Sequence, residues 1–210
     1  MKSPTKECDD CDTEQMDMGV SLKEKMWGHL LSEKTILINS DIDESLIEKA
    51  VMQIYAFNRI DDDNQIAAGK NEYIREPIKV YINTNGGCID PAFSFISAVQ
   101  TSRTPVITIA LGTCASAGFL MLLAGHIRFM QPHTFLMHHQ GSAGYIGKFA
   151  DIVEYSRHWE YCQLKIDQYV LKQTKIKKKK LQEIFSHKQD WYITLDEAIL
   201  LGIVNDVWVG

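Results

Sequence analysis

Ser116 lies in a segment that could expose a nucleophilic hydroxyl. The run of small residues from Gly112 to Gly118 (GTCASAG) follows the β-branched stretch 106–111 and precedes an apolar stretch that predicts a buried helix. A strand, a turn and a helix start would expose the hydroxyl, let a substrate backbone approach, and place free N–H groups beside a developing oxyanion. Small residues at a helix start also serve close packing, so this segment alone does not separate catalysis from packing.

A serine nucleophile needs a base, and the base needs an orienting acid. The histidines that follow Ser116 are His126, His133, His138, His139, His158 and His187. His138 and His139 end a predicted strand, where neighbouring side chains point to opposite faces, so only one of them can face Ser116. The residues alone do not choose between the two.

Asp190 is the candidate acid, because it precedes the run Trp191 to Ile193 between two predicted helices. The N-cap of a short helix is the competing interpretation, since aspartate is a preferred capping residue. The local pattern leaves both interpretations open.

A second turn, Asn85-Gly86-Gly87, follows the predicted strand 78–83 at its carboxyl end. Active sites of open α/β sheets gather at such ends. Two adjacent glycines expose backbone N–H groups without side-chain obstruction, which suits an oxyanion hole or the pairing of an extended peptide. An ordinary tight turn is the alternative.

The elements that would position these residues alternate between strands and helices, which predicts a parallel α/β fold. Predicted strands cover 35–39, 78–83, 106–111, 127–130, 134–137 and 203–209, and predicted helices cover 43–58, 89–101, 115–124, 151–174 and 194–201. The polar stretch 59–76 predicts a long surface loop, with local helix as the alternative. The helix over 151–174 carries an apolar stripe, which is typical of core or subunit contact.

The 210 residues are enough for one domain with a substantial core, which we assign to 21–210. Residues 1–20 are rich in Asp and Glu and predict a mobile acidic arm. The formal charge of −5 disfavours a nucleic-acid binder, which would usually be basic. The lysine-rich segment 172–180 contains no interleaved aromatic residues, so it favours a solvated helix start over a nucleic-acid site.

The five cysteines are irregularly spaced, which predicts no disulfide framework and a reducing, cytoplasmic compartment. Cys8 and Cys11 form a C-x-x-C pair, but no second pair of ligands lies nearby, so we predict no metal site. The N-terminus lacks the apolar stretch of a signal peptide. The uncharged stretch 104–125 could cross a bilayer, yet its β-branched start and Gly112 favour a strand, a turn and a buried helix. We therefore predict no membrane span.

Four segments together resemble the ClpP family, the proteolytic subunits of the Clp protease. They are YINTNGG at 81–87, GTCASAGFLMLLAG at 112–125, MHHQ at 137–140 and QDWYITLDEAILLGIVNDV at 189–207. The resemblance extends from about Thr35 to Val209. Each segment by itself is weak evidence for the family, but their order and compatible spacing make the combined match specific.

The resemblance implies a ClpP/crotonase-like α/β fold of repeated ββα units with a protruding handle at about 141–174, which consists of a strand at 141–147 and the long helix after it. It implies a serine endopeptidase that cleaves unfolded polypeptides to short peptides inside a ring-shaped chamber. The implied catalytic residues are Ser116, His139 and Asp190, with backbone oxyanion donors at Gly87 and Ala117. The implied substrate-binding residues are Gly86, Gly141, Ser142, Ala143 and Gly144. The resemblance further implies a homo-oligomer of heptameric rings, stacked as a 14-mer, a Clp-type ATP-driven unfoldase as partner, and no cofactor.

Several features depart from the family pattern and keep further functions open. The stretch 59–76 is long, the arm at 1–20 is unusual, Lys79 replaces an aromatic residue of the unfoldase-docking strand, and Gly141 replaces a proline. These departures suggest a divergent or viral member that processes a specific partner, as in capsid maturation, without an unfoldase. The same fold would also suit a non-catalytic ring subunit, or a lyase or hydratase of the crotonase type.

Overall fold

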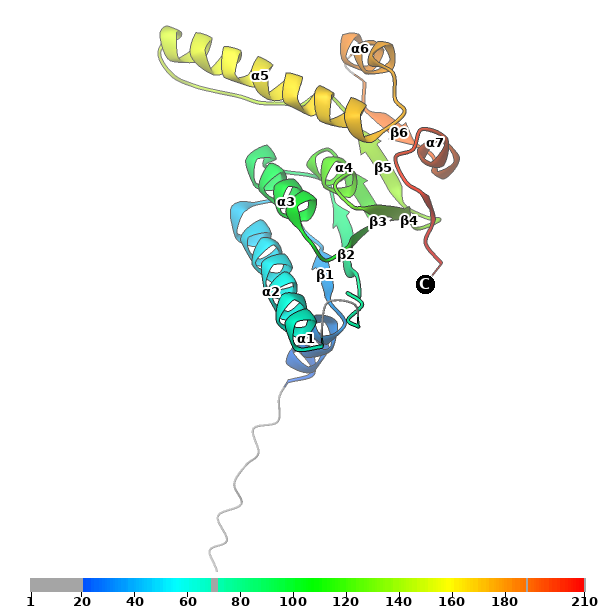
Figure 1. Ribbon diagram of the computed structural model, residues 1–210. Coiled ribbons are helices and arrows are strands. Elements are labelled where there is room, and N and C mark those ends of the chain that lie inside the picture. The colour runs from blue at the N-terminus through cyan, green and yellow to red at the C-terminus, as the bar shows by residue number, and fades with distance from the viewer. Residues whose placement is uncertain (1–20, 69–71, 188, 210) are drawn as a thin grey trace, which may run out of the picture.

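A seven-stranded, mainly parallel β-sheet forms the centre of the molecule (Figure 1). The structure is a computed structural model that describes residues 21–68, 72–187 and 189–209. In this part of the chain the strands are β1 (Thr35–Ile38), β2 (Ile78–Thr84), β3 (Val106–Ala115), β4 (Ile127–Met130), β5 (Phe135–His138), β6 (Trp191–Ile193) and β7 (Asp206–Val207). The helices are α1 (Leu22–Ser32), α2 (Glu44–Ala68), α3 (Ile89–Thr101), α4 (Ala117–Leu122), α5 (Phe149–Gln173), α6 (Lys178–Ser186) and α7 (Leu195–Leu200). Helices α2, α3 and α4 lie along one face of the sheet.

Strand β3 divides the sheet into two arms. The order β1-β2-β3-β4-β7 is parallel throughout. The first half of β3, from Ile107 to Ala110, pairs with β4, and the second half, from Thr113 to Ala115, pairs in parallel with β5. Strand β6 then adds to β5 in the antiparallel direction. The parallel α/β arrangement predicted from the sequence is confirmed.

A bulge between the two halves of β3 directs its end toward β5. The pairing register of β2 and β3 shifts between Ile82 and Thr84. Gly112 there has φ 58°, a left-handed value that favours glycine. The Asn83 side chain accepts the N–H of Thr113 at 2.9 Å and so holds the bulge in place. Because a bulge bends its strand, the last residues of β3 leave β4 and join β5.

Helix α2 is longer than the sequence pattern predicted. The stretch 59–76 was expected to be a surface loop, with local helix as the alternative, and the helix continues through its first half to Ala68. Asp61, in these last turns, is fully buried and accepts hydrogen bonds from Lys34 at 2.5 Å, Thr104 at 2.5 Å and Tyr73 at 2.7 Å. Although burial opposes its ionisation, these hydrogen bonds outweigh that effect and lower the pKa of the Asp61 carboxyl. The alternative of local helix therefore holds for the first half of the stretch, because buried polar contacts stabilise this end of the helix, and apolar periodicity does not indicate such contacts.

Helix α5 and the segment before it project together from the body of the molecule (Figure 1). The expected strand at 141–147 is absent: this described segment has no strand pairing and runs beside α5. Gly141 donates its N–H to Gln163 at 3.1 Å, and Tyr145 stacks on Tyr155 with 4.7 Å between ring centres. The strand prediction was wrong for a single chain because a strand needs a neighbouring strand for its backbone hydrogen bonds.

The apolar stripe of α5 is divided between core and surface. Ile166 and Val170, near the C-terminal end, are buried in the main core. Toward the N-terminal end, Trp159 is half-buried, and Ile152 is 42% exposed. The N-terminal part of the stripe therefore does not pack against the hydrophobic core of the described chain.

Other predicted elements differ mainly at their ends. The helix expected at 115–124 begins at Ala117, because β3 continues pairing to Ala115. The terminal strand expected at 203–209 is limited to Asp206–Val207. Strand β6 and helix α1 were not predicted, whereas α6 begins in the lysine-rich segment where a helix start was expected.

The uncharged stretch 104–125 forms strand β3 and helix α4, as the sequence predicted. Among the described residues, no helix has the length and apolar character needed to cross a membrane. The predicted acidic arm at 1–20, with Cys8 and Cys11, lies outside the described residues.

Candidate active site

Ser116 occupies a sharp turn between β3 and α4. Its φ of 54° and ψ of −119° are unfavourable for a residue with a Cβ and cost on the order of 1–3 kcal/mol. The N–H of Ser116 donates to the carbonyl of Met137 at 3.0 Å, which fixes the turn to the end of β5. The turn also needs Gly86, because a Cβ there would lie 2.6 Å from the Cβ of Ser116.

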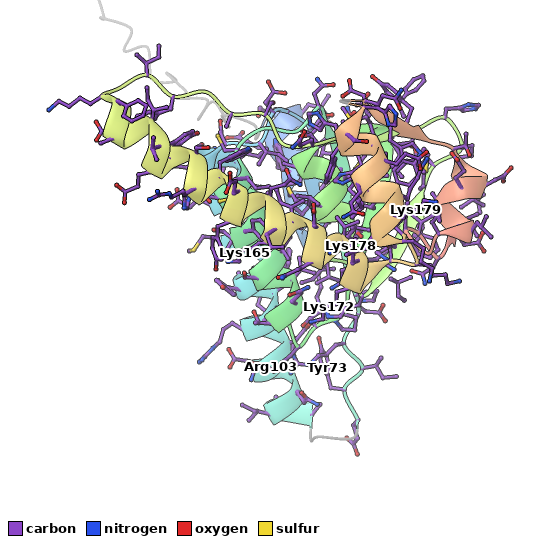
Figure 2. The ribbon with its side chains drawn as sticks, turned by 90° about the horizontal axis from the view of Figure 1, so that it is seen from above. Tyr73, Arg103, Lys165, Lys172, Lys178 and Lys179 are labelled. Carbon is purple, nitrogen blue, oxygen red and sulfur yellow. The ribbon has the colours of Figure 1, made fainter. Side chains whose placement is uncertain are left out.

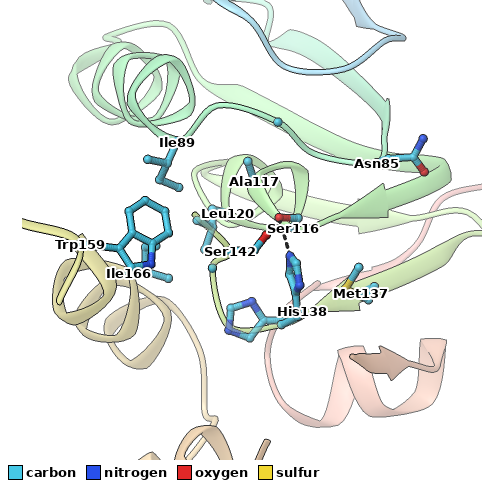
Figure 3. Close-up of a pocket in the computed structure, with 13 residues that line it drawn as sticks. Asn85, Ile89, Ser116, Ala117, Leu120, Met137, His138, Ser142, Trp159 and Ile166 are labelled. Carbon is cyan, nitrogen blue, oxygen red and sulfur yellow. Dashed lines mark hydrogen bonds between the residues drawn. The ribbon is translucent and has the colours of Figure 1, made fainter. Parts of the chain in front are cut away.

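His139 is the histidine that meets Ser116. Its Nε2 lies 2.8 Å from the Ser116 Oγ (Figure 3, dashed line). The strand register explains this contact: Ala115 of β3 pairs with Met137 of β5, so both chains leave the sheet side by side. The neighbouring His138 side chain points to the other face, as expected for consecutive strand residues, and is only 2% exposed.

Asp190 lies beside His139 on the far side from Ser116. In the antiparallel pair, His138 of β5 faces Trp191 of β6, so one further step in register places His139 opposite Asp190. The His139 Nδ1 and the Asp190 Oδ1 are 3.5 Å apart, and the aspartate side chain is about half exposed. The interpretation of Asp190 as a helix N-cap is wrong, because Thr194 caps the following helix α7 with a capping box.

Two backbone N–H groups near Ser116 are free to bind an anion. Ile42 donates its N–H to the Gly86 carbonyl and accepts from the Cys88 N–H, each at 2.8 Å, and so holds the glycine turn. Within the described residues, the N–H of Gly87 between them has no hydrogen-bond partner. Ala117 is the first residue of α4, and the first N–H groups of a helix have no intrahelical partner.

A cavity of about 300 Å³ opens beside the Ser116 hydroxyl (Figure 3). It is lined by Asn85, Gly87, Ile89, Ser116, Ala117, Leu120, Met137, His138, His139, Gly141, Ser142, Trp159 and Ile166. Helix α5 closes one side through the last two of these residues, as Figure 3 shows. A hydroxyl with an imidazole at hydrogen-bond distance, facing a largely apolar cavity, can attack a bound carbonyl group.

Comparison with known proteins places the chain in a family. The family model for Clp protease matches residues 19–210. The chain belongs to the Clp protease family. Its members are peptidases, and relatives carry the name ATP-dependent Clp protease proteolytic subunit 2. The protein of that name from Treponema pallidum is 25% identical over 179 residues, which cover 84% of this chain and 83% of the relative. The one from Pseudomonas aeruginosa is 25% identical over 204 residues, which cover 96% and 94%.

The fold agrees with this membership. A ClpP1 mutant from Listeria monocytogenes superposes with a TM-score of 0.72 at 21% identity, over 88% of this chain and 96% of that chain. The predicted ClpP-like fold is therefore confirmed.

The predicted substrate-binding residues are only partly at the cavity. Gly141 and Ser142 line it, and Gly86 adjoins Ser116 from the glycine turn. Ala143 and Gly144 are exposed and do not line the cavity.

Sequence reasoning missed Trp159 and Ile166 as cavity residues, because it assigned no chemistry to the α5 stripe. The signal that could have found them is Gly141. A Cβ there would lie 2.8 Å from the Trp159 ring, so this glycine lets α5 approach the site.

His138 is a second histidine in the cavity wall, also unassigned by sequence reasoning. Its ring stacks on Phe119 with 4.8 Å between ring centres and lies near Phe185. Burial, together with the neighbouring His139, lowers the pKa of His138 to about 4. This imidazole is therefore neutral near pH 7.

The lysine-rich segment lies where α5 ends and α6 begins (Figure 2). Lys172, Lys178 and Lys179 are exposed there, as expected for a solvated helix start. Lys180 lies over the Trp191 ring, 5.1 Å from its centre.

Proposed function

We propose that this chain is a serine endopeptidase in which Ser116 attacks the peptide carbonyl. The observation that carries the proposal is the 2.8 Å contact between the Ser116 Oγ and the His139 Nε2 at the edge of the cavity. Membership of a peptidase family supports the same activity.

In the proposed mechanism, His139 takes the proton of Ser116 as the serine oxygen attacks. For Nε2 to accept this proton, the proton of the neutral imidazole must sit on Nδ1, which faces Asp190. Asp190 would hold this tautomer and stabilise the imidazolium that forms. The 3.5 Å separation is long for a hydrogen bond, and such contacts often tighten when substrate binds.

The free N–H groups of Gly87 and Ala117 would stabilise the oxyanion of the tetrahedral intermediate. Both residues line the cavity next to Ser116, which supports this role. Gly87 has φ 145°, and a Cβ there would lie 2.3 Å from the Ile42 carbonyl oxygen, so only glycine suits this position. His139 would then donate its proton to the leaving amine, and water would release the acyl group from Ser116.

The substrate in this proposal is an unfolded polypeptide that binds in an extended form. Residues 141–144, which have no strand partner in the described chain, would pair with the substrate backbone as an added strand. Apart from the Gly141 N–H, which donates to Gln163, the described chain shows no hydrogen-bond partner for the backbone of this segment, which supports the proposal.

We also propose that the chain assembles into heptameric rings, stacked as a 14-mer around a chamber and fed by a Clp-type unfoldase. The outer handle, residues 141–174, carries exposed apolar side chains that suit subunit contact: Ile146 is 99% exposed, and Phe149 is 82% exposed. We place this assembly in the cytoplasm, in line with the irregular cysteine spacing.

Labelling with a fluorophosphonate probe tests the proposed nucleophile. Wild-type protein should become labelled, and Ser116→Ala should abolish the labelling. Ser97→Ala is the matched control, because Ser97 is exposed on α3 and does not line the cavity. Equal labelling of wild type and Ser116→Ala would exclude Ser116 as the nucleophile.

A further inference from the structure

The cavity beside Ser116 has largely apolar walls, and a buried polar atom without a hydrogen-bond partner lies next to it. Ile89, Leu120, Trp159 and Ile166 provide most of the apolar wall. His138 lies in the same wall, and its Nε2 has no hydrogen-bond partner among the described residues (Figure 3). No Asp, Glu, Lys or Arg from the described part of the chain lines the cavity.

Neither packing nor the proposed mechanism requires an imidazole at this position. The contact with Ser116 belongs to His139, and His138 is 2% exposed between Phe119 and Phe185. An apolar side chain would fill this place without leaving a buried nitrogen unpaired, which is costly and rare in folded proteins. The nitrogen is therefore expected to find its partner in a group that enters the cavity and shifts the ring, because Nε2 itself is buried in this structure.

We propose, resting on the proposed peptidase function, that His138 selects substrates whose side chain next to the scissile bond ends in an uncharged hydrogen-bonding group. The cavity adjoins the Ser116 hydroxyl, so the side chain next to the attacked carbonyl is the one that can enter it. Its apolar walls suit a stem of carbon atoms or a ring, and its volume of about 300 Å³ is sufficient for a tyrosine or glutamine side chain.

The imidazole chemistry defines this class further. A neutral imidazole can pair with a hydroxyl or a carboxamide, each of which can both donate and accept. A charged side chain would enter without a counter-ion, because the lining residues provide none, and burying an unpaired charge is costly. A site built around a buried polar group discriminates against a substrate that leaves that group unpaired.

Matched substrates measure the preference. One pair of fluorogenic peptides carries Tyr or Phe before the scissile bond, and these two peptides differ by one hydroxyl. A second pair carries Gln or Met, which are similar in length but differ in the carboxamide group. We expect wild type to favour Tyr over Phe, and Gln over Met, by about tenfold in kcat/KM, which is the effect of one net hydrogen bond. His138→Leu should lower both ratios to about one.

Two further variants keep this test decisive. His138→Gln retains a hydrogen-bonding group and should keep a preference in the same direction, even if His138→Leu does not fold. Ser97→Ala removes an exposed hydroxyl on α3, outside the cavity, and should keep the wild-type ratios.

The result separates this inference from the proposed function. If wild type cleaves both members of each pair equally, or if His138→Leu keeps the wild-type ratios, the inference is wrong while the peptidase assignment stands. If wild type reacts with no fluorophosphonate and cleaves no peptide, the proposed function itself fails.

Discussion

Acidification should destabilise the folded chain through His138. Burial lowers the pKa of this histidine from its ordinary value of 6.5 to about 4 in the folded state. Between these two values the unfolded chain binds a proton at His138 and the folded chain does not. The free energy of unfolding therefore falls as the pH drops from about 6.5 toward 4, and this contribution is fully retained above that range.

The size of the effect follows from the two pKa values. Protonation of His138 in the unfolded chain, with these two pKa values, lowers the free energy of unfolding by about 2 kcal/mol between pH 7 and pH 5. A change of this size is a large fraction of the 5–15 kcal/mol, roughly, that stabilises a typical domain.

Urea denaturation at pH 7 and pH 5, at one protein concentration, measures this contribution. Intrinsic tryptophan fluorescence can follow the transition, because the chain contains four tryptophans. Wild type should lose about 2 kcal/mol more than His138→Leu between the two pH values. His133→Leu is the control, since His133 is exposed in the turn between β4 and β5, and this variant should follow the wild type.

An equal loss of stability on acidification in wild type and His138→Leu would contradict this role of His138. Such a result would mean that the imidazole is protonated in the folded state at pH 5, so that the ring is hydrated or paired. The neutral, unpaired group on which the selection of substrates depends would then be absent.

Two further predictions concern the glycine turn and the buried carboxylate of α2. Gly86→Ala should lower kcat/KM about 100-fold, because its Cβ would lie 2.6 Å from the Cβ of Ser116 and displace the nucleophile. Peptide hydrolysis by Gly28→Ala, where an added Cβ meets nothing within 4 Å, should stay close to wild type, and equal activity of the two variants would contradict the prediction. Asp61→Asn should lower the free energy of unfolding by about 2–3 kcal/mol, because it removes the charge of a buried, hydrogen-bonded ion pair. Asp63→Asn breaks only an exposed pair and should cost less than about 1 kcal/mol in urea denaturation, so a similar loss in both variants would count against the role of Asp61.

Short-range patterns in the sequence were sufficient for the elements that carry the candidate site. The β-branched run before Gly112 predicted β3, and the small residues after it predicted the turn that exposes Ser116. The alternation of strands with helices predicted a parallel sheet, which brings the carboxyl ends of the strands to one edge. These inferences succeeded because each depends on neighbours within a few residues.

Elements held by distant polar contacts were not predictable in this way. The last turns of α2 look like a loop in sequence, yet Asp61 is satisfied by Lys34, Tyr73 and Thr104. These partners are 27, 12 and 43 residues away along the chain. No periodic pattern reports such a cluster.

Local sequence patterns predicted that a serine lies in an exposed small-residue turn and that only one of two adjacent histidines could reach it. The choice of His139 needed the pairing of Ala115 with Met137, and the position of Asp190 needed the antiparallel register of β5 and β6. The burial of His138, with an unpaired nitrogen, became visible in the folded chain alone. The physical reason is that strand alternation separates the two histidines, whereas the packing of α4, α5 and α6 decides what each of them meets.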